Sequence, residues 1–184
     1  MHPRFSAFMN AAAENPFGIN SKNYPEFMGR CSEHIVRKGK DMADYFTESP
    51  EPDKIIYEVY EAESQANMRT ALTVLKPGKV GTEYHMTKGH FHEDPEAGEV
   101  YFCLKGRGII LMQTRDGRTD EVWLEPGSVA CIPPLWAHRT VNVGNYDFVM
   151  LAIFPTDSGH DYGTIEKEGF IKRVVEENGV PKVV

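Results

Sequence analysis

Residues 87–101 read TKGHFHEDPEAGEVY, a segment in which two histidines, a polar loop and the start of an apolar run follow one another. His90 and His92 are two residues apart, and alternate side chains of an extended strand share a face, so both imidazoles can bind one cation. Phe91 then points to the opposite face. The intervening loop is rich in residues that break strands, and Glu99 opens the next β run, EVYFCLKG. A hairpin over this loop would return Glu99 beside the two histidines.

A fourth candidate ligand lies in residues 133–142, PPLWAHRTVN, where His138 follows a double-proline corner and leads into a strand-like run. A His-x-His pair alone is more often a packed or surface pair than a metal site. Three neutral imidazoles and one carboxylate, however, form a donor set that suits iron, manganese, nickel or zinc and is too rich in nitrogen for calcium or magnesium. We expect one divalent transition metal per chain, and the candidate ligands are His90, His92, Glu99 and His138.

The rest of the chain is a series of short β-rich runs separated by turn signals. Its 16 glycines and 12 prolines are spread along the sequence and separate runs such as KIIYEVYEAE, TALTVL, GIILMQT, SVACIPP and FVMLAIF. This pattern is typical of a β-sandwich or barrel. Hairpin-like turns are expected at residues 76–79 (KPGK), 115–117 (RDG), 125–127 (EPG) and 143–145 (VGN).

Helical signal is confined to two short stretches outside these runs. Residues 41–46 read DMADYF, and residues 164–169 read TIEKEG. In the second stretch Thr164 can cap a helix of one or two turns and Gly169 can end it. We expect neither helix to lie in the core.

Both ends of the chain carry strand-like segments beyond the central runs. Residues 170–184 predict a terminal hairpin outside the barrel, closed by an Asn-Gly turn at 178–179. Residues 31–39, CSEHIVRKG, can pair either at a sheet edge or across a dimer interface, and the sequence does not choose between the two.

Composition limits the classes of protein that fit. A chain of 184 residues with 41% hydrophobic residues forms one soluble domain, and a net charge of −7 is unfavourable for binding nucleic acid. A small phosphorylated metabolite is still a suitable ligand, because backbone N–H groups, hydroxyls and one or two cations can hold one phosphate. Three cysteines without C-x-x-C spacing favour a reducing cytoplasm. We expect no signal peptide and no membrane span.

The spacing of the site residues resembles that of the cupin superfamily, whose jelly-roll barrel carries a His-x-His, Glu and His metal centre. The matching intervals join Glu99 to Gly106 and, later, connect Gly127, Pro133, His138 and Asn142. Two features depart from a general cupin motif. The loop between His92 and Glu99 is longer than usual, and Leu135 stands where many cupins have glycine.

A narrower resemblance accounts for the long loop and the double proline. TVLKPGKVGTEYHMTKGHFH, EVY, PPLWAHRTVN and GHDYG, found at residues 73–92, 99–101, 133–142 and 159–163, closely resemble the cupin-type glucose-6-phosphate isomerases. The resemblance runs from about Ile55 to the C-terminus, and PFG at 16–18 echoes the N-terminal region of that family. It implies an all-β cupin jelly-roll barrel with short peripheral helices and extra N-terminal strands. Residues 1–184 would form a single domain, with an N-terminal extension (1–54), a barrel (55–160) and a C-terminal extension (161–184).

This resemblance also implies a reaction and roles for named residues. The reaction is the reversible conversion of glucose 6-phosphate and fructose 6-phosphate through an enediol, in glycolysis and gluconeogenesis, by a cytoplasmic homodimer. The metal would be iron(II), with zinc, manganese and nickel as alternatives. Glu99 is a candidate base as well as a ligand, although a purely structural ligand and a metal-assisted hydride shift are open alternatives. Tyr101 shares a strand face with Glu99, so its hydroxyl can meet a sugar oxygen, and His160 would contact the sugar and help to open its ring. The phosphate would be held by Tyr57, Thr73, Thr87, Gly89 and Tyr162.

Two other classes of function remain compatible with the same ligands. One is a different cupin enzyme, such as a sugar-phosphate epimerase, a mannose-phosphate isomerase or an iron dioxygenase. The other is a non-catalytic cupin that binds a sugar and contains a metal. The remaining histidines, His2, His34 and His85, are not expected to be ligands, and His85 is expected to be a strand residue near the site.

Overall fold

A computed structural model describes residues 23–62 and 67–184, so the PFG motif at 16–18 lies outside the described residues. Two short α-helices, α1 and α2, span Tyr24–Met28 and Tyr162–Glu168. The first strands are β1 (Glu33–Lys38), β2 (Ile55–Glu61), β3 (Met68–Leu75), β4 (Lys79–Val80) and β5 (Glu83–Tyr84). The central strands are β6 (Glu99–Lys105), β7 (Gly108–Thr114), β8 (Thr119–Leu124), β9 (Val129–Ile132), β10 (Trp136–Asn142) and β11 (Phe148–Pro155). The last two strands are β12 (Val174–Glu177) and β13 (Val180–Val183).

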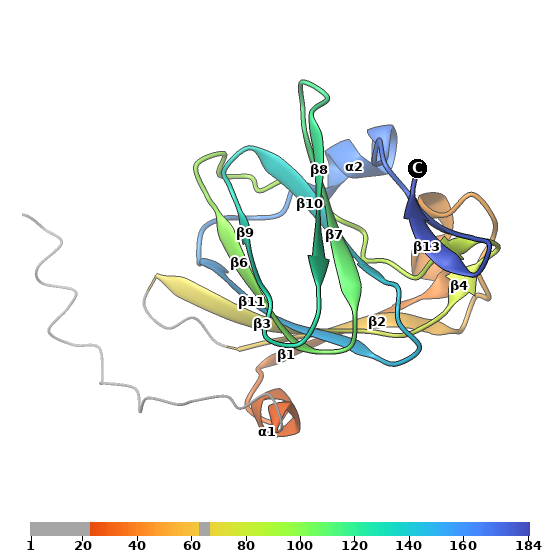
Figure 1. The fold of residues 1–184 in the computed structure, drawn as a ribbon. Coiled ribbons are helices and arrows are strands. Elements are labelled where there is room, and N and C mark those ends of the chain that lie inside the picture. The colour runs from red at the N-terminus through yellow and green to blue at the C-terminus, as the bar shows by residue number, and fades with distance from the viewer. Residues whose placement is uncertain (1–22, 63–66) are drawn as a thin grey trace, which may run out of the picture.

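The named strand pairs are all antiparallel and form three sheets (Figure 1). The large sheet has the order β1-β2-β3-β11-β6-β9, the second has the order β10-β7-β8, and the small sheet has the order β13-β12-β5-β4. Consecutive strands repeatedly change sheet, as in a jelly roll. The all-β cupin arrangement expected from the sequence is therefore confirmed.

The main core lies between the large sheet and the β10-β7-β8 sheet. Ile109 and Ile110 of β7 pack there with Phe148 and Met150 of β11, and all four side chains are fully buried. The alternate residues of β11 face the other side of the large sheet and join a second cluster that includes Phe27 of α1. The run FVMLAIF is apolar without alternation because β11 is covered on both faces.

Three of the four expected hairpin turns have a different role. Residues 115–117 do close a hairpin between the paired strands β7 and β8. Residues 76–79, however, lead from β3 of the large sheet into β4 of the small sheet, and residues 125–127 and 143–145 each join a strand of the β10-β7-β8 sheet to a strand of the large sheet. The hairpin prediction is wrong for these three turns, because a turn sequence marks a reversal of the chain without specifying which sheet receives the next strand.

The expected helix at residues 41–46 is also wrong in type. Two short 3₁₀ turns, Gly39–Asp41 and Ala43–Tyr45, occupy this region. Helix α2 is confirmed and ends at Gly169, which has φ of +72°, but its N-cap is Asp161, whose carboxylate accepts a hydrogen bond from the Thr164 N–H.

Both terminal segments take positions that the sequence allowed. Strand β1 pairs with β2 at one edge of the large sheet, which is one of the two options for residues 31–39. Strands β12 and β13 form the expected terminal hairpin, and Asn178 and Gly179 both have positive φ, as a type I′ turn requires. This hairpin extends the small sheet through β5.

Candidate metal centre and adjoining pocket

The four predicted ligands come together from three segments of the chain. His90 and His92 lie on an extended segment that is anchored by isolated bridges, one of which pairs His90 with His138 of β10. Phe91 between them is buried in the core, so the two imidazoles share a face as the alternation predicts. Glu99 is the first residue of β6 and completes the cluster.

The geometry of the cluster suits a single metal ion. One donor atom from each of His90, His92, Glu99 and His138 lies within 4.8 Å of the others. Glu99 Oε2 is 2.9 Å from His138 Nε2 and 3.2 Å from His92 Nε2. The Nδ1 atom of His92 is 3.0 Å from the Ala97 carbonyl oxygen, which leaves Nε2 free to face the cluster. His90 Nε2 is buried without a hydrogen-bond partner in the described part of the chain, as expected of a nitrogen placed to bind a cation.

The protonation states of Glu99 and His90 also favour metal binding. Burial opposes ionisation of Glu99, but His138 and His92 more than compensate and hold its pKa well below the usual range. Burial, together with the neighbouring imidazoles of His138 and His160, lowers the pKa of His90 well below its ordinary value. At neutral pH the cluster therefore offers a carboxylate and a neutral imidazole, which are the forms that coordinate metals.

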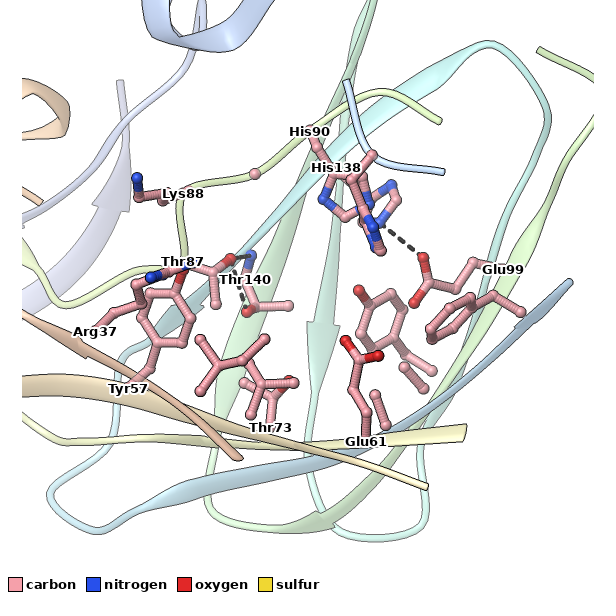
Figure 2. A pocket seen from close by; sticks show the side chains of 18 of the residues that line it. Arg37, Tyr57, Glu61, Thr73, Thr87, Lys88, His90, Glu99, His138 and Thr140 are labelled. Atoms are coloured by element: carbon pink, nitrogen blue, oxygen red, sulfur yellow. Dashed lines mark hydrogen bonds and ion pairs between the residues drawn. The ribbon is translucent and has the colours of Figure 1, made fainter. Parts of the chain in front are cut away.

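A pocket extends from this cluster between the large sheet and the β10-β7-β8 sheet, and Figure 2 shows its polar side chains. His90, Glu99 and His138 lie at one end of the view, whereas Arg37, Tyr57, Thr87 and Lys88 lie at the other. Every residue predicted to contact the substrate lines this pocket: Tyr57, Thr73, Thr87, Gly89, Tyr101, His160 and Tyr162. His92 lines a second hollow beside it, together with His160 and Tyr162.

His160 and Tyr101 flank the metal cluster. The His160 ring lies 4.4 Å from the His90 ring, centroid to centroid, and stacks on Tyr162 at 5.6 Å. Burial lowers the pKa of His160, so its ring is neutral near pH 7. Tyr101 is buried, and burial together with the Glu99 carboxylate raises the pKa of its hydroxyl well above the ordinary value. The Tyr101 hydroxyl is therefore a permanent hydrogen-bond donor.

The opposite end of the pocket is rich in hydroxyls and cations. The Thr87 hydroxyl oxygen accepts a hydrogen bond from the Thr140 N–H at 3.1 Å and lies 3.3 Å from the Thr140 hydroxyl. Burial raises the pKa of the Tyr57 hydroxyl, and the nearby Arg37 guanidinium acts in the opposite direction. These groups are the ones that commonly surround a bound phosphate.

Arg37, Glu61 and Thr140 line the pocket but were missed from the sequence. The signal for Glu61 was available, because Tyr57, Val59 and Glu61 alternate along β2 and share the pocket face. Arg37 required knowledge that β1 pairs with β2, which brings Arg37 opposite Tyr57. Glu61 is half-buried and lies 3.6 Å from Arg69, measured between side-chain oxygen and nitrogen.

The other histidines in the described residues lie outside the metal cluster. His34 is half-exposed, pairs with Glu58 at 2.9 Å and stacks on Tyr60. His85 is fully buried, and its Nδ1 lies 3.2 Å from the Lys76 carbonyl oxygen. His2 is outside the described residues.

Jelly-roll sheets with three histidines and one glutamate at one end of a pocket define the chain as a cupin with a candidate metal site. The family model described as glucose-6-phosphate isomerase (GPI) matches residues 38–183, and the chain belongs to this family.

Curated relatives agree with this assignment over most of the chain. The glucose-6-phosphate isomerase of Pyrococcus furiosus is 44% identical over 181 residues, which cover 93% of this chain and 95% of that protein. The glucose-6-phosphate isomerase of Pyrococcus horikoshii is 48% identical over 160 residues, which cover 82% of this chain and 85% of that protein. Among solved structures, an oxalate decarboxylase of Bacillus subtilis aligns with a TM-score of 0.48 and 25% identity, covering 57% of this chain and 27% of the decarboxylase chain.

Proposed function

We propose that this protein interconverts glucose 6-phosphate and fructose 6-phosphate in a metal-dependent reaction. The observation that carries the proposal is one pocket with two chemically different ends, a three-histidine, one-glutamate cluster and a hydroxyl-rich cationic region. Membership in the glucose-6-phosphate isomerase family supports the choice of substrate. The carbonyl carbons would lie at the metal end and the phosphate at the other.

The phosphate end holds its ligand mainly through neutral donors. We assign Tyr57, Thr73, Thr87, Gly89 and Tyr162 to it, all of which line the pocket. Arg37 adds a guanidinium to this set. A local cation of this kind is compatible with the net charge of −7, because one arginine at hydrogen-bond range outweighs distant surface charge.

The metal end would bind one divalent ion through His90, His92, Glu99 and His138. We propose iron(II), with zinc, manganese and nickel as alternatives that the same donor set accepts. The bound metal would act as a Lewis acid on the oxygens at C1 and C2 of the open-chain sugar. Its binding requires the neutral His90 imidazole and the ionised Glu99 described above.

The chain's own residues would carry the proton transfer. Glu99 is the proposed base, which removes the proton from C2 and returns it to C1, while one proton moves from O2 to O1. Tyr101 donates a hydrogen bond to a sugar oxygen throughout, because its hydroxyl stays protonated. His160, neutral at pH 7, is placed to exchange a proton with the ring oxygen during ring opening.

The decisive experiment is an isomerase assay on metal-free protein refilled with single metals. We expect turnover of fructose 6-phosphate to glucose 6-phosphate with at least one of the four metals and none after chelation. Glu99→Gln with metal retained should lose at least 100-fold in kcat, since general base catalysis contributes about 10²–10⁴-fold. Absence of turnover with every metal, or conversion of mannose 6-phosphate alone, would reject the proposed reaction.

We also propose a cytoplasmic homodimer that acts in glycolysis and gluconeogenesis. The three cysteines are free, which suits a reducing compartment. No helix within residues 23–62 and 67–184 combines the length and apolarity needed to cross a membrane. Support for the dimer comes from β1, which lies at an edge of the large sheet. Light scattering that returns a monomer would contradict the dimer.

A further inference from the structure

We propose that Arg139 is a positioning residue for phosphate binding, which acts by holding the Lys88–Gly89 peptide so that the Gly89 N–H faces the pocket. The proposal rests on the proposed function, because it assumes that the Thr87 end of the pocket binds phosphate. Arg139 itself is not among the residues that line the pocket.

The Arg139 side chain is buried behind the pocket wall. It lies on β10 between His138 and Thr140, which both line the pocket, so alternation directs Arg139 to the other face. Only 3% of the residue is exposed. Its guanidinium lies 4.4 Å from the centroid of the Phe170 ring, which packs behind the same segment.

Two nitrogen atoms of the Arg139 guanidinium donate hydrogen bonds to one backbone oxygen. Nη2 donates to the Lys88 carbonyl oxygen at 2.6 Å and Nε donates to it at 3.3 Å. A hydrogen bond from a charged donor polarises the peptide and strengthens its N–H as a donor on the other side. Arg139 thereby fixes the orientation of the Lys88–Gly89 peptide.

Peptide geometry then determines the direction of the Gly89 N–H. In a planar trans peptide the carbonyl and the N–H point in opposite directions, so a carbonyl turned to the buried Arg139 turns the N–H away from it. Two nearby N–H groups are engaged, that of Thr87 with the Thr140 carbonyl and that of His90 with the His138 carbonyl. The buried Gly89 N–H has no acceptor within the described ranges, which is costly unless a ligand supplies one.

The charge of Arg139 supports an anionic ligand. Across residues 23–62 and 67–184, no carboxylate lies within ion-pair distance of its guanidinium, and the buried Glu83 pairs with Arg173 instead. An unpaired guanidinium in a low-dielectric site attracts a nearby anion more strongly than an exposed one does. A phosphate bound at Gly89 would lie on the far side of the peptide from this charge.

Thermal unfolding of metal-free protein with added inorganic phosphate tests the proposal without relying on turnover. The variants are Arg139→Met, which removes the charge and both donors, and Arg139→Lys, which keeps the charge and one donor group. Arg118→Gln is the matched control, since Arg118 is an exposed arginine on the neighbouring hairpin that pairs with Asp116 at 3.3 Å. Zinc added to phosphate-free protein measures the metal cluster separately, and sodium chloride at equal ionic strength controls for screening.

We expect phosphate to raise the Tm of the wild type and of Arg118→Gln by equal amounts. Arg139→Met should lose at least 80% of this shift and Arg139→Lys about half, while both keep the zinc-induced shift. In the loaded enzyme, the KM for glucose 6-phosphate should rise at least tenfold in Arg139→Met with kcat changed less than threefold.

Three outcomes would overturn the assignment: an unchanged phosphate shift in Arg139→Met, a loss of the zinc shift equal to that of the phosphate shift, or no phosphate shift in the wild type. Wild-type turnover distinguishes this failure from that of the proposed function. Isomerase activity without a phosphate shift rejects the role of Arg139 alone. A phosphate shift that depends on Arg139 without isomerase activity rejects the reaction alone.

Discussion

Replacement of Gly89 by alanine should destabilise the protein far more than the same replacement at another glycine with a similar backbone. Gly89 has φ of +74°, and an added Cβ would lie 2.6 Å from Phe170 Cε2 and 3.0 Å from both Arg139 Cβ and the His138 carbonyl oxygen. Gly117 has φ of +88° and nothing within 4 Å of its added Cβ. Comparison of Gly89→Ala with Gly117→Ala therefore separates the free energy lost through the backbone conformation from that lost through the close contacts.

The expected magnitudes follow from these two contributions. A left-handed conformation costs a residue with a Cβ about 1–2 kcal/mol, which is the whole effect expected for Gly117→Ala. Overpacking adds about 1–3 kcal/mol at Gly89, so Gly89→Ala should lower the free energy of unfolding by about 2–5 kcal/mol. The His138 backbone and Arg139 Cβ cannot both move away from the added methyl group unless β10 itself shifts.

Urea unfolding of the metal-free variants measures this difference. Because His90 is the next residue and is bridged to His138, Gly89→Ala should also weaken zinc binding and raise the KM for glucose 6-phosphate, whereas Gly117→Ala should change neither. Equal stability of the two variants, with unchanged zinc affinity, would show that the close approach at Gly89 has no energetic consequence.

Three further predictions concern titration, a buried ion pair and the metal. The buried His85 has a pKa lowered from 6.5 to about 4 by burial, so this residue should contribute about 3 kcal/mol to the fall in stability as pH drops from 6.5 to 4. The fall should be smaller by this amount in urea titrations of His85→Gln, and a pH profile identical to that of the wild type would refute the assignment. Glu83 accepts hydrogen bonds from the Thr47 backbone and hydroxyl and pairs with Arg173, so Glu83→Gln should cost about 2–3 kcal/mol by the same method. Chelation should lower the Tm and abolish turnover while leaving the far-ultraviolet circular dichroism of the strands intact, and an unchanged Tm would argue against a bound metal.

Much of the metal cluster was predictable because its signals are local. The two-residue spacing of His90 and His92 and the strand-breaking loop before Glu99 require only the geometry of extended chain and turns. The position of His138 followed from spacing and from resemblance to a family. The structure brings all four together.

The wrong or missing predictions depend on long-range contacts. Arg37 reaches the pocket only because β1 adds to the edge of the large sheet beside β2. The stretch at 41–46 has helical residues but is held in two 3₁₀ turns, where Met42 and Tyr45 pack into the core. In both places tertiary packing determines the structure, and short-range sequence patterns do not predict that packing.

Strand β10 carries His138 at one end of the pocket and Thr140, beside Thr87, toward the other (Figure 2). Residues two apart on a strand are separated by roughly 7 Å along the backbone. A hydrogen-bonded strand is stiff, so the distance between the positions of His138 and Thr140 is fixed. Under the proposed function, the protein would measure how many carbons separate the carbonyl from the phosphate. The protein would then select the length of the sugar's carbon chain without a separate contact to each sugar hydroxyl.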